Sequence, residues 1–198
     1  GNLLEWYDFA VYGYFAPIIG AAFFPSSDPL TSLLAAFGAF AAGFIARPLG
    51  AIIFGHIGDR IGRKASLTVS IFVMGLATVG IGVLPDYETL GPVAAVFLVL
   101  LRMLQGIGVS GEYAGGIVFL AEHAPPERRG RMAAWPELGS DAGFLLGSAV
   151  GALTAAGLGE AGLKEWGWRI PFAFGGVLTL VMLTLRREMP ESFAGSTP

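Results

Sequence analysis

Long apolar runs separated by short polar segments divide the chain into six parts. The runs cover about residues 6–24, 30–54, 65–84, 93–121, 132–157 and 170–185. Each is close to the roughly 20 apolar residues that a helix needs to cross a bilayer. Apolar runs of this length are typical of transmembrane helices and too long for strands. We therefore predict an all-α polytopic membrane protein with six transmembrane helices, formed by residues 1–198 as one bundle.

Composition supports a membrane protein and excludes several kinds of site. Of the 198 residues, 54% are hydrophobic and 14% charged, against about a quarter charged in soluble domains. The absence of cysteine excludes disulfides, thiolate metal sites and cysteine nucleophiles. A net charge of -3, with the basic residues spread among short loops, leaves no basic groove for nucleic acid. The lipid bilayer is the expected partner.

The most polar stretch between two apolar runs is the segment 55–64, which reads Gly-His-Ile-Gly-Asp-Arg-Ile-Gly-Arg-Lys. Its three glycines predict a sharp reversal of the backbone, so we expect a tight loop between the second and third helices. The charges of Arg60, Arg63 and Lys64 are of the kind that stays on the cytoplasmic side during insertion.

The distribution of Lys and Arg predicts the orientation of the bundle. Eight of the twelve lie in the segments 55–64, 122–131 and 186–187, whereas the turns at the opposite end hold only Lys164 and Arg169. Arg47 and Arg102 lie inside apolar runs. We therefore expect both ends of this six-helix segment to be cytoplasmic. The first run contains acidic residues and no small-residue cleavage site follows it, so we predict a retained helix and not a signal peptide.

Regularly spaced glycines predict close helix packing. Gly139, Gly143, Gly147 and Gly151 recur every four residues and would form one smooth ridge. The segment 106–111 matches the dinucleotide fingerprint Gly-x-Gly-x-x-Gly, but it lies inside a long apolar run, without the strand and turn that nucleotide binding requires. Helix packing is the favoured interpretation of these glycines as well.

Ionisable residues inside the apolar runs are the main candidates for function, because each costs about 2.5–3.5 kcal/mol or more at the bilayer centre. There are seven of them: Glu5, Asp8, Arg47, Arg102, Glu112, Glu137 and Asp141. With five carboxylates and two arginines, some carboxylates must be protonated, hydrated or paired with groups outside this chain.

Counting along the runs at about 1.5 Å per residue assigns depths to these residues. It places Asp8, Arg47, Glu112 and Glu137 in the cytoplasmic third, and Arg102 near the midplane with Gln105 one turn on. Asp8 shares a helix face with Tyr12, as Glu137 does with Asp141. We accordingly predict a charged cluster of Asp8, Arg47 and Glu112, either a stabilising ion pair or a proton-coupling device, and a solvated Glu5 at the interface.

Several segments together resemble the metabolite:proton symporter family of the major facilitator superfamily. They are Asn2–Phe9, Arg47–Gly50, the segment Gly55–Lys64, Arg102–Gly106 and Gly111–Glu112. The resemblance implies the N-terminal half of a twelve-helix fold, so that a C-terminal six-helix half is missing from these residues. It also implies proton-driven symport of a small organic solute across a bacterial inner (plasma) membrane, powered by the proton gradient without a cofactor. The solute site is then expected between the halves.

The same resemblance assigns residues to a cytoplasmic gate. The signature-loop residues are Gly55, Asp59, Arg60, Gly62, Arg63 and Lys64. Glu122 and Arg129, with the segment 190–192, resemble the elements that form a charge network with that loop in the superfamily.

The favoured function is therefore a secondary transporter in which Arg102 and Gln105 contact solute or couple it to protons. Glu137 and Asp141 are the next candidates for the proton carrier after Asp8 and Glu112. A passive channel or a six-span accessory subunit is one alternative. A membrane-embedded hydrolase using Glu137 and Asp141 is another, and it is disfavoured because both histidines lie in loops. The two arginines within the apolar runs favour an anionic carboxylate over a zwitterion as solute, because a guanidinium matches the planar carboxylate group.

Overall fold

Six long helices form one bundle in the computed structural model, which describes residues 2–188 except for the side chains of 113–115, 118, 119 and 121–123. The long helices are α1 (Asn2–Phe23), α2 (Pro29–Arg60), α3 (Arg63–Val83), α5 (Pro92–His123), α7 (Trp135–Gly162) and α8 (Arg169–Arg187). Four short elements join them: α4 (Tyr87–Leu90), the 3₁₀ turn η1 (Pro126–Arg128), α6 (Arg129–Ala133) and the π-helical η2 (Leu163–Gly167). Residues 2–188 contain no strand, so the predicted all-α class is confirmed.

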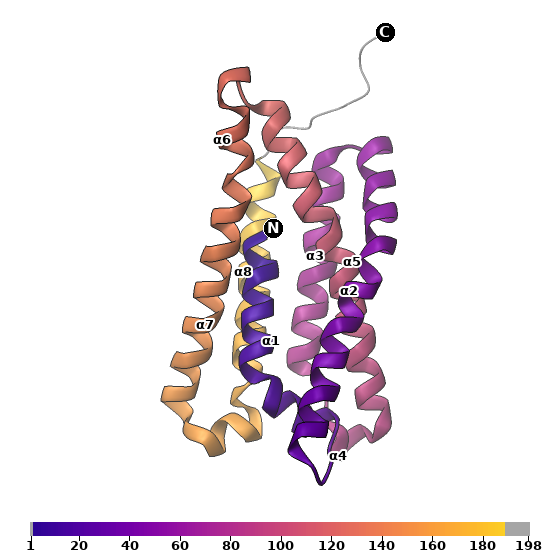
Figure 1. Ribbon diagram of the computed structural model, residues 1–198, viewed down its shortest axis with the longest axis vertical. Helices are drawn as coiled ribbons and strands as arrows, with labels where there is room; N and C mark the ends of the chain where they lie inside the picture. The colour runs from indigo at the N-terminus through magenta and orange to yellow at the C-terminus, as the bar shows by residue number, and fades with distance from the viewer. Residues whose placement is uncertain (1, 189–198) are drawn as a thin grey trace.

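The helices run side by side along the long axis of the molecule, with α1 in the middle (Figure 1). Helix α1 packs against α2, α5, α7 and α8. Its buried positions include the polar side chains of Asn2, Glu5, Asp8 and two tyrosines. The acidic side chains of this helix are thus enclosed by the other helices.

Five segments within the described residues are long and apolar enough to cross a membrane: 29–60, 63–83, 92–112, 126–167 and 169–187. The first predicted span is not among them, although α1 has 22 residues. Its acidic and tyrosine side chains lower its apolar content, and all of them except Tyr14, which is 46% exposed, face protein neighbours and not lipid. Enclosure by the other helices explains how such a helix is stable in a membrane.

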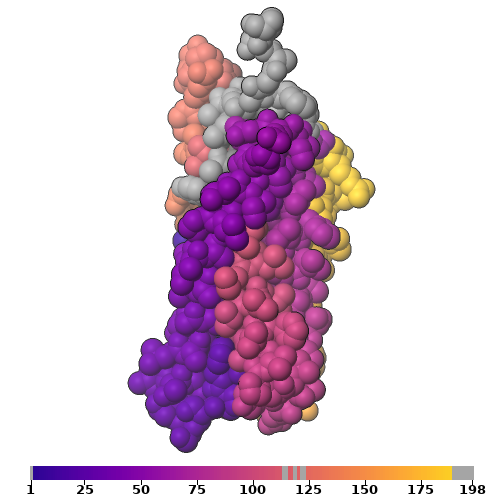
Figure 2. Space-filling model, turned by 90° about the vertical axis from the view of Figure 1, so that its right-hand side faces the viewer, coloured from indigo at the N-terminus to yellow at the C-terminus, as the bar shows by residue number. Residues whose placement is uncertain are grey.

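Large apolar side chains cover the outside of the bundle. Ile45 and Ile52 of α2 are 78% and 72% exposed, and Leu145 and Leu153 of α7 are each 72% exposed. Figure 2 shows one outer face, on which α2 runs diagonally past α5. Apolar groups outside and charged groups inside are the arrangement expected when lipid is the solvent.

The glycine ridge of α7 packs against α1, as the sequence predicted. A Cβ atom at Gly143 would overlap the Leu3 carbonyl oxygen, and one at Gly147 would lie 2.6 Å from the carbonyl oxygen of Tyr7. Gly151 faces the ring of Tyr14. Only glycine allows the two backbones to approach this closely.

The glycines of the segment 106–111 also serve packing. A Cβ at Gly106 would overlap the backbone of Gly43 in α2, and one at Gly108 would lie 2.9 Å from the Met74 backbone nitrogen in α3. The segment is helical throughout and has no turn that could cradle a phosphate. Helix packing, the favoured interpretation, is confirmed.

The predicted ten-residue loop at 55–64 is wrong in extent. Helix α2 continues to Arg60 and α3 begins at Arg63, so Ile61 and Gly62 alone make the reversal. Gly62 is the one glycine of this segment with a positive φ, at 126°. The onset of charge marks where the chain leaves the hydrocarbon layer, whereas the helix continues beyond it. At about 1.5 Å per residue the 32-residue α2 is roughly 48 Å long, against a hydrocarbon core of about 30 Å.

Candidate functional site

A closed polar cluster lies at the centre of the bundle around Asp8 of α1. Arg102 of α5 donates from Nη1 to Asp8 Oδ2 at 2.6 Å. Gln105 donates from Nε2 to Asp8 Oδ1 and to Thr78 Oγ1 of α3, both at 2.8 Å. All four side chains are at most 2% exposed. We call Asp8, Thr78, Arg102 and Gln105 the Asp8 cluster.

Aromatic rings cover the guanidinium of Arg102. Its carbon lies 4.4 Å from the centre of the Tyr12 ring and 4.7 Å from that of Phe40, both within the range of a cation–π contact. The Tyr12 hydroxyl donates to the Ala36 carbonyl oxygen at 2.7 Å, which fixes the ring. The adjoining cavity measures about 10 Å³, so at most about one water fits there. The Asp8 cluster is therefore closed to bulk solvent.

A second ion pair lies one turn away on α1 and is open. Arg47 of α2 donates from Nη2 to Glu5 Oε1 at 2.7 Å. The side chain of Glu5 is 5% exposed and that of Arg47 31% exposed. The guanidinium carbon lies 4.3 Å from the ring centre of Phe44 and 5.4 Å from that of Phe9. Both charged residues line a cavity of about 360 Å³.

A third pair joins α3, α5 and α8 nearer the predicted cytoplasmic end. Arg186 donates from Nη2 to Glu112 Oε2 at 2.6 Å. Ser70 donates from its hydroxyl to Glu112 Oε1 at 2.7 Å. Because these groups come from three helices and are buried, they hold one end of the bundle together.

The predicted pairing of Arg47 with Asp8 or Glu112 is wrong, because each of these residues belongs to a different pair. Glu5, expected in solvent, is buried against Arg47. Helix rise measured from the outer turns matches the Glu5–Arg47 pair. Both Glu5 and Arg47 lie about 27 Å from the outer ends of their helices, Phe23 and Pro29.

Three polar partners carried no usable sequence signal for this role. Thr78 and Ser70 are small polar residues in an apolar run, and such residues are commonly neutral packing positions. Arg186 was assigned to the basic end of the last helix, although its long side chain reaches back to Glu112. The contact between Arg186 and Glu112 depends on the length of the arginine side chain, which counting the helix rise per residue does not include.

Glu137 and Asp141 lie on an exposed face of α7 beside Trp6 of α1. Glu137 borders the 360 Å³ cavity, and both carboxylates border an adjoining cavity of about 280 Å³. Carboxylates in direct contact with lipid are costly. This face, formed by α1, α2, α5 and α7, therefore meets water or further protein.

The signature-loop residues lie at one end of the bundle. The exposed Asp59 and the half-buried Arg63 form an i,i+4 pair at 3.3 Å, and Lys64 donates from Nζ to the Arg187 carbonyl oxygen at 2.9 Å. Arg60 and Arg129 are exposed. The side chain of Glu122 and the segment 190–192 lie outside the described residues, so their part in a gate stays a prediction.

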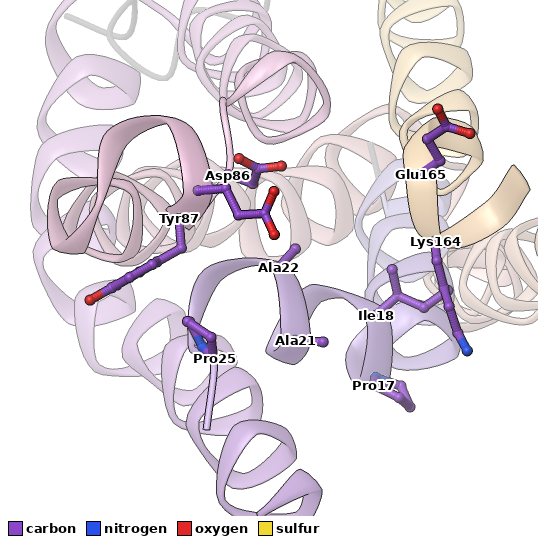
Figure 3. Close-up of a pocket in the computed structure, with 10 residues that line it drawn as sticks. Pro17, Ile18, Ala21, Ala22, Pro25, Asp86, Tyr87, Lys164 and Glu165 are labelled. Atoms are coloured by element: carbon purple, nitrogen blue, oxygen red, sulfur yellow. The ribbon is translucent and has the colours of Figure 1, made fainter. Parts of the chain in front are cut away.

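A further cavity of about 500 Å³ opens at the opposite end of the bundle (Figure 3). The end of α1 forms its floor, Asp86 and Tyr87 lie on one wall, and Lys164 and Glu165 of η2 on the other. Across the described side chains, no group of three or more His, Cys, Asp or Glu could hold a metal ion.

Comparison with known families identifies this architecture. The family model described as "Sugar (and other) transporter" matches residues 1–194. The chain belongs to this family. Its solved relatives include a proton:xylose symporter of the major facilitator superfamily, so the predicted superfamily is confirmed, and the family is one of transporters and not enzymes.

Curated members of the transporter family match nearly the whole chain. It is 43% identical to the proline/betaine transporter of Escherichia coli K12, and the match covers 97% of this chain and 38% of that protein. The shikimate transporter and the alpha-ketoglutarate permease of the same organism are 41% and 42% identical, each over 97% of this chain and 44% of the relative. The chain thus spans less than half the length of these relatives.

Solved members have the same fold. The partially occluded, inward-open xylose transporter XylE of E. coli superposes with a TM-score of 0.85 at 25% identity, over 97% of this chain and 48% of that one. The chain is therefore the N-terminal half of a major facilitator fold.

Proposed function

We propose that this chain forms the N-terminal half of a proton-coupled symporter for a small organic solute. In this proposal a second six-helix half packs on the face formed by α1, α2, α5 and α7. That face carries the charged cavity residues that lipid cannot solvate. The protein lies in a bacterial inner membrane with both ends of this half cytoplasmic, which the eight basic residues at one end support.

The observation that carries the proposal is the Asp8 cluster. A carboxylate that is 1% exposed and bound to a guanidinium that is 2% exposed is stable only while its charge is compensated. When Asp8 gains a proton at an oxygen that bonded to Arg102 or Gln105, the guanidinium loses its counter-charge. The protonated and unprotonated forms therefore favour different helix arrangements, and coupling requires such a two-state element.

The proton path in this mechanism begins and ends in water. One proton enters from the outside, binds a carboxylate oxygen of Asp8, and leaves to the cytoplasm after the change of access. Arg102 then pairs with Asp8 again. Tyr12 and Phe40 keep the guanidinium in place in both steps through their ring contacts.

The Glu5–Arg47 pair is the part of the site that a solute can reach. It faces a cavity large enough for a small metabolite, and the solutes named for the relatives, proline, betaine, shikimate and alpha-ketoglutarate, each carry a carboxylate. A guanidinium offers a planar set of donors that matches a carboxylate. A carboxylate-bearing solute is therefore proposed.

Transport by the full-length protein in proteoliposomes tests the symport. With an inside-alkaline proton gradient, radiolabelled glycine betaine, shikimate and alpha-ketoglutarate are offered one at a time, and at least one is expected to accumulate above its external concentration. A protonophore should abolish that accumulation. Equilibration without accumulation, unaffected by the protonophore, would identify a passive channel instead.

A further inference from the structure

The 360 Å³ cavity is lined by charges of both signs. Arg47 of α2, Glu5 of α1 and Glu137 of α7 contribute to its walls together with Trp6, Val109, Ser110 and Ser140. The class of solute that these walls accept is inferred on the basis of the proposed transport function.

Arg47 has unused hydrogen-bonding capacity. A guanidinium has five N–H donors. Among the described residues, Arg47 uses one of its nitrogens, Nη2, in a hydrogen bond to Glu5. Its Nε is buried without a protein partner. The rings of Phe9 and Phe44 hold the guanidinium in place. A preorganised cation with free donors is suited to bind a ligand carboxylate.

The other charges of the cavity disfavour an anion as the ligand. With Glu5 paired to Arg47, the additional carboxylate of Glu137 leaves the walls contributed by this half with a net negative charge, and Asp141 in the adjoining cavity adds to it. A solute with only negative charge would be repelled by Glu137. A neutral zwitterion is not, and its cationic end is attracted to the same carboxylate.

Trp6 adds a surface that favours a cationic nitrogen. It is half-buried, lines both cavities, and is held edge-on against Phe9 at 5.6 Å between ring centres. Tryptophan binds alkylammonium groups better than the other aromatic side chains do. Glu137 lies in the wall of the same two cavities.

We infer that this cavity binds a zwitterion, with the solute carboxylate on Arg47 and its alkylammonium nitrogen between Trp6 and Glu137. A zwitterion takes the place of the anionic solute that the two arginines led us to expect, because Glu5 and Asp8 already neutralise Arg47 and Arg102.

Equilibrium binding to the purified full-length protein, without a proton gradient, tests the inference by calorimetry. The probes are two zwitterions, glycine betaine and L-proline. Two single-charge probes complete the set. 3,3-Dimethylbutyrate has the shape of betaine without its positive charge, and choline lacks the carboxylate. At least one zwitterion should bind about tenfold or more tightly than either single-charge probe. No binding of either zwitterion, or equal binding of 3,3-dimethylbutyrate, overturns the inference.

Variants assign the two ends of the solute. Glu137→Gln should weaken binding of the zwitterion about tenfold without weakening that of 3,3-dimethylbutyrate. Glu88→Gln, which neutralises an exposed carboxylate at the opposite end, is the matched control and should change neither. An equal loss for both probes in Glu137→Gln would show a structural effect and contradict the cationic subsite.

The carboxylate end is tested with a double variant, because Arg47→Met alone leaves Glu5 unpaired. Glu5→Gln/Arg47→Met should weaken the zwitterion and 3,3-dimethylbutyrate by more than tenfold and leave choline unchanged. Unchanged zwitterion binding would overturn the role of Arg47. Because no proton gradient is used, these outcomes are independent of whether accumulation is protonophore-sensitive, so failure of the inference and failure of the symport are distinguishable.

Discussion

Two carboxylate–arginine pairs lie three residues apart on α1, and their surroundings differ. Asp8 and Arg102 are enclosed by Tyr12 and Phe40, and further bonds come from Gln105. Glu5 is equally buried, but its partner Arg47 is about a third exposed to a cavity. Two pairs that each join a carboxylate to an arginine therefore suit different tasks. The closed pair can hold a proton out of contact with solvent, and the open pair can exchange partners with a solute.

The largest expected effect is on stability and separates the two pairs directly. Arg102→Met leaves a fully buried carboxylate without its counter-charge, which should cost roughly 3–5 kcal/mol. Arg47→Met should cost less, about 1–3 kcal/mol, because water can reach the cavity side of that pair although Glu5 itself is buried. Thermal unfolding of the purified full-length protein measures both. Partial recovery in Asp8→Asn/Arg102→Met is expected, and equal losses for the two single variants would contradict the difference in burial.

A smaller effect is expected from displacing the helix that carries both carboxylates. Gly147→Ala places a Cβ atom 2.6 Å from the Tyr7 carbonyl oxygen, so α1 or α7 must shift, at a cost of about 1–3 kcal/mol. Because the closed cluster needs bonds from three helices, proton-driven accumulation should fall more than solute binding does. Gly139→Ala is the matched control, since its Cβ would lie 3.8 Å from the nearest α1 atom. If both alanines behaved alike, close packing of α1 on α7 would not be what positions Asp8.

The sequence predicts the helical class, the family and the packing role of the glycines, because each depends on a pattern repeated over many residues. It also identifies the ionisable residues that matter, since charge within an apolar run is unusual wherever it occurs. Their partners are harder to predict. Pairing depends on a few ångströms of relative helix position and on side-chain length, as the contact between Arg186 and Glu112 shows.

The turn at Ile61–Gly62 illustrates the same limit. Glycine content predicted a loop over ten residues, whereas Gly55 and Gly58 are helical and only Gly62 adopts a positive φ. Glycine permits a left-handed backbone without requiring it, so composition alone does not locate the reversal. The residues assigned to a cytoplasmic gate depend on contacts that the sequence does not determine.

The central claim, that Asp8 and not Glu5 carries the proton, is tested most directly by measuring solute-driven proton uptake in proteoliposomes of the full-length protein. Asp8→Asn should abolish proton uptake while solute exchange down its own gradient continues. Glu5→Gln should retain proton uptake with each solute molecule. Asp28→Asn, at an exposed helix N-cap where asparagine serves equally well, is the control and should match the wild type. Continued proton uptake in Asp8→Asn, or its loss in Glu5→Gln alone, would contradict the account.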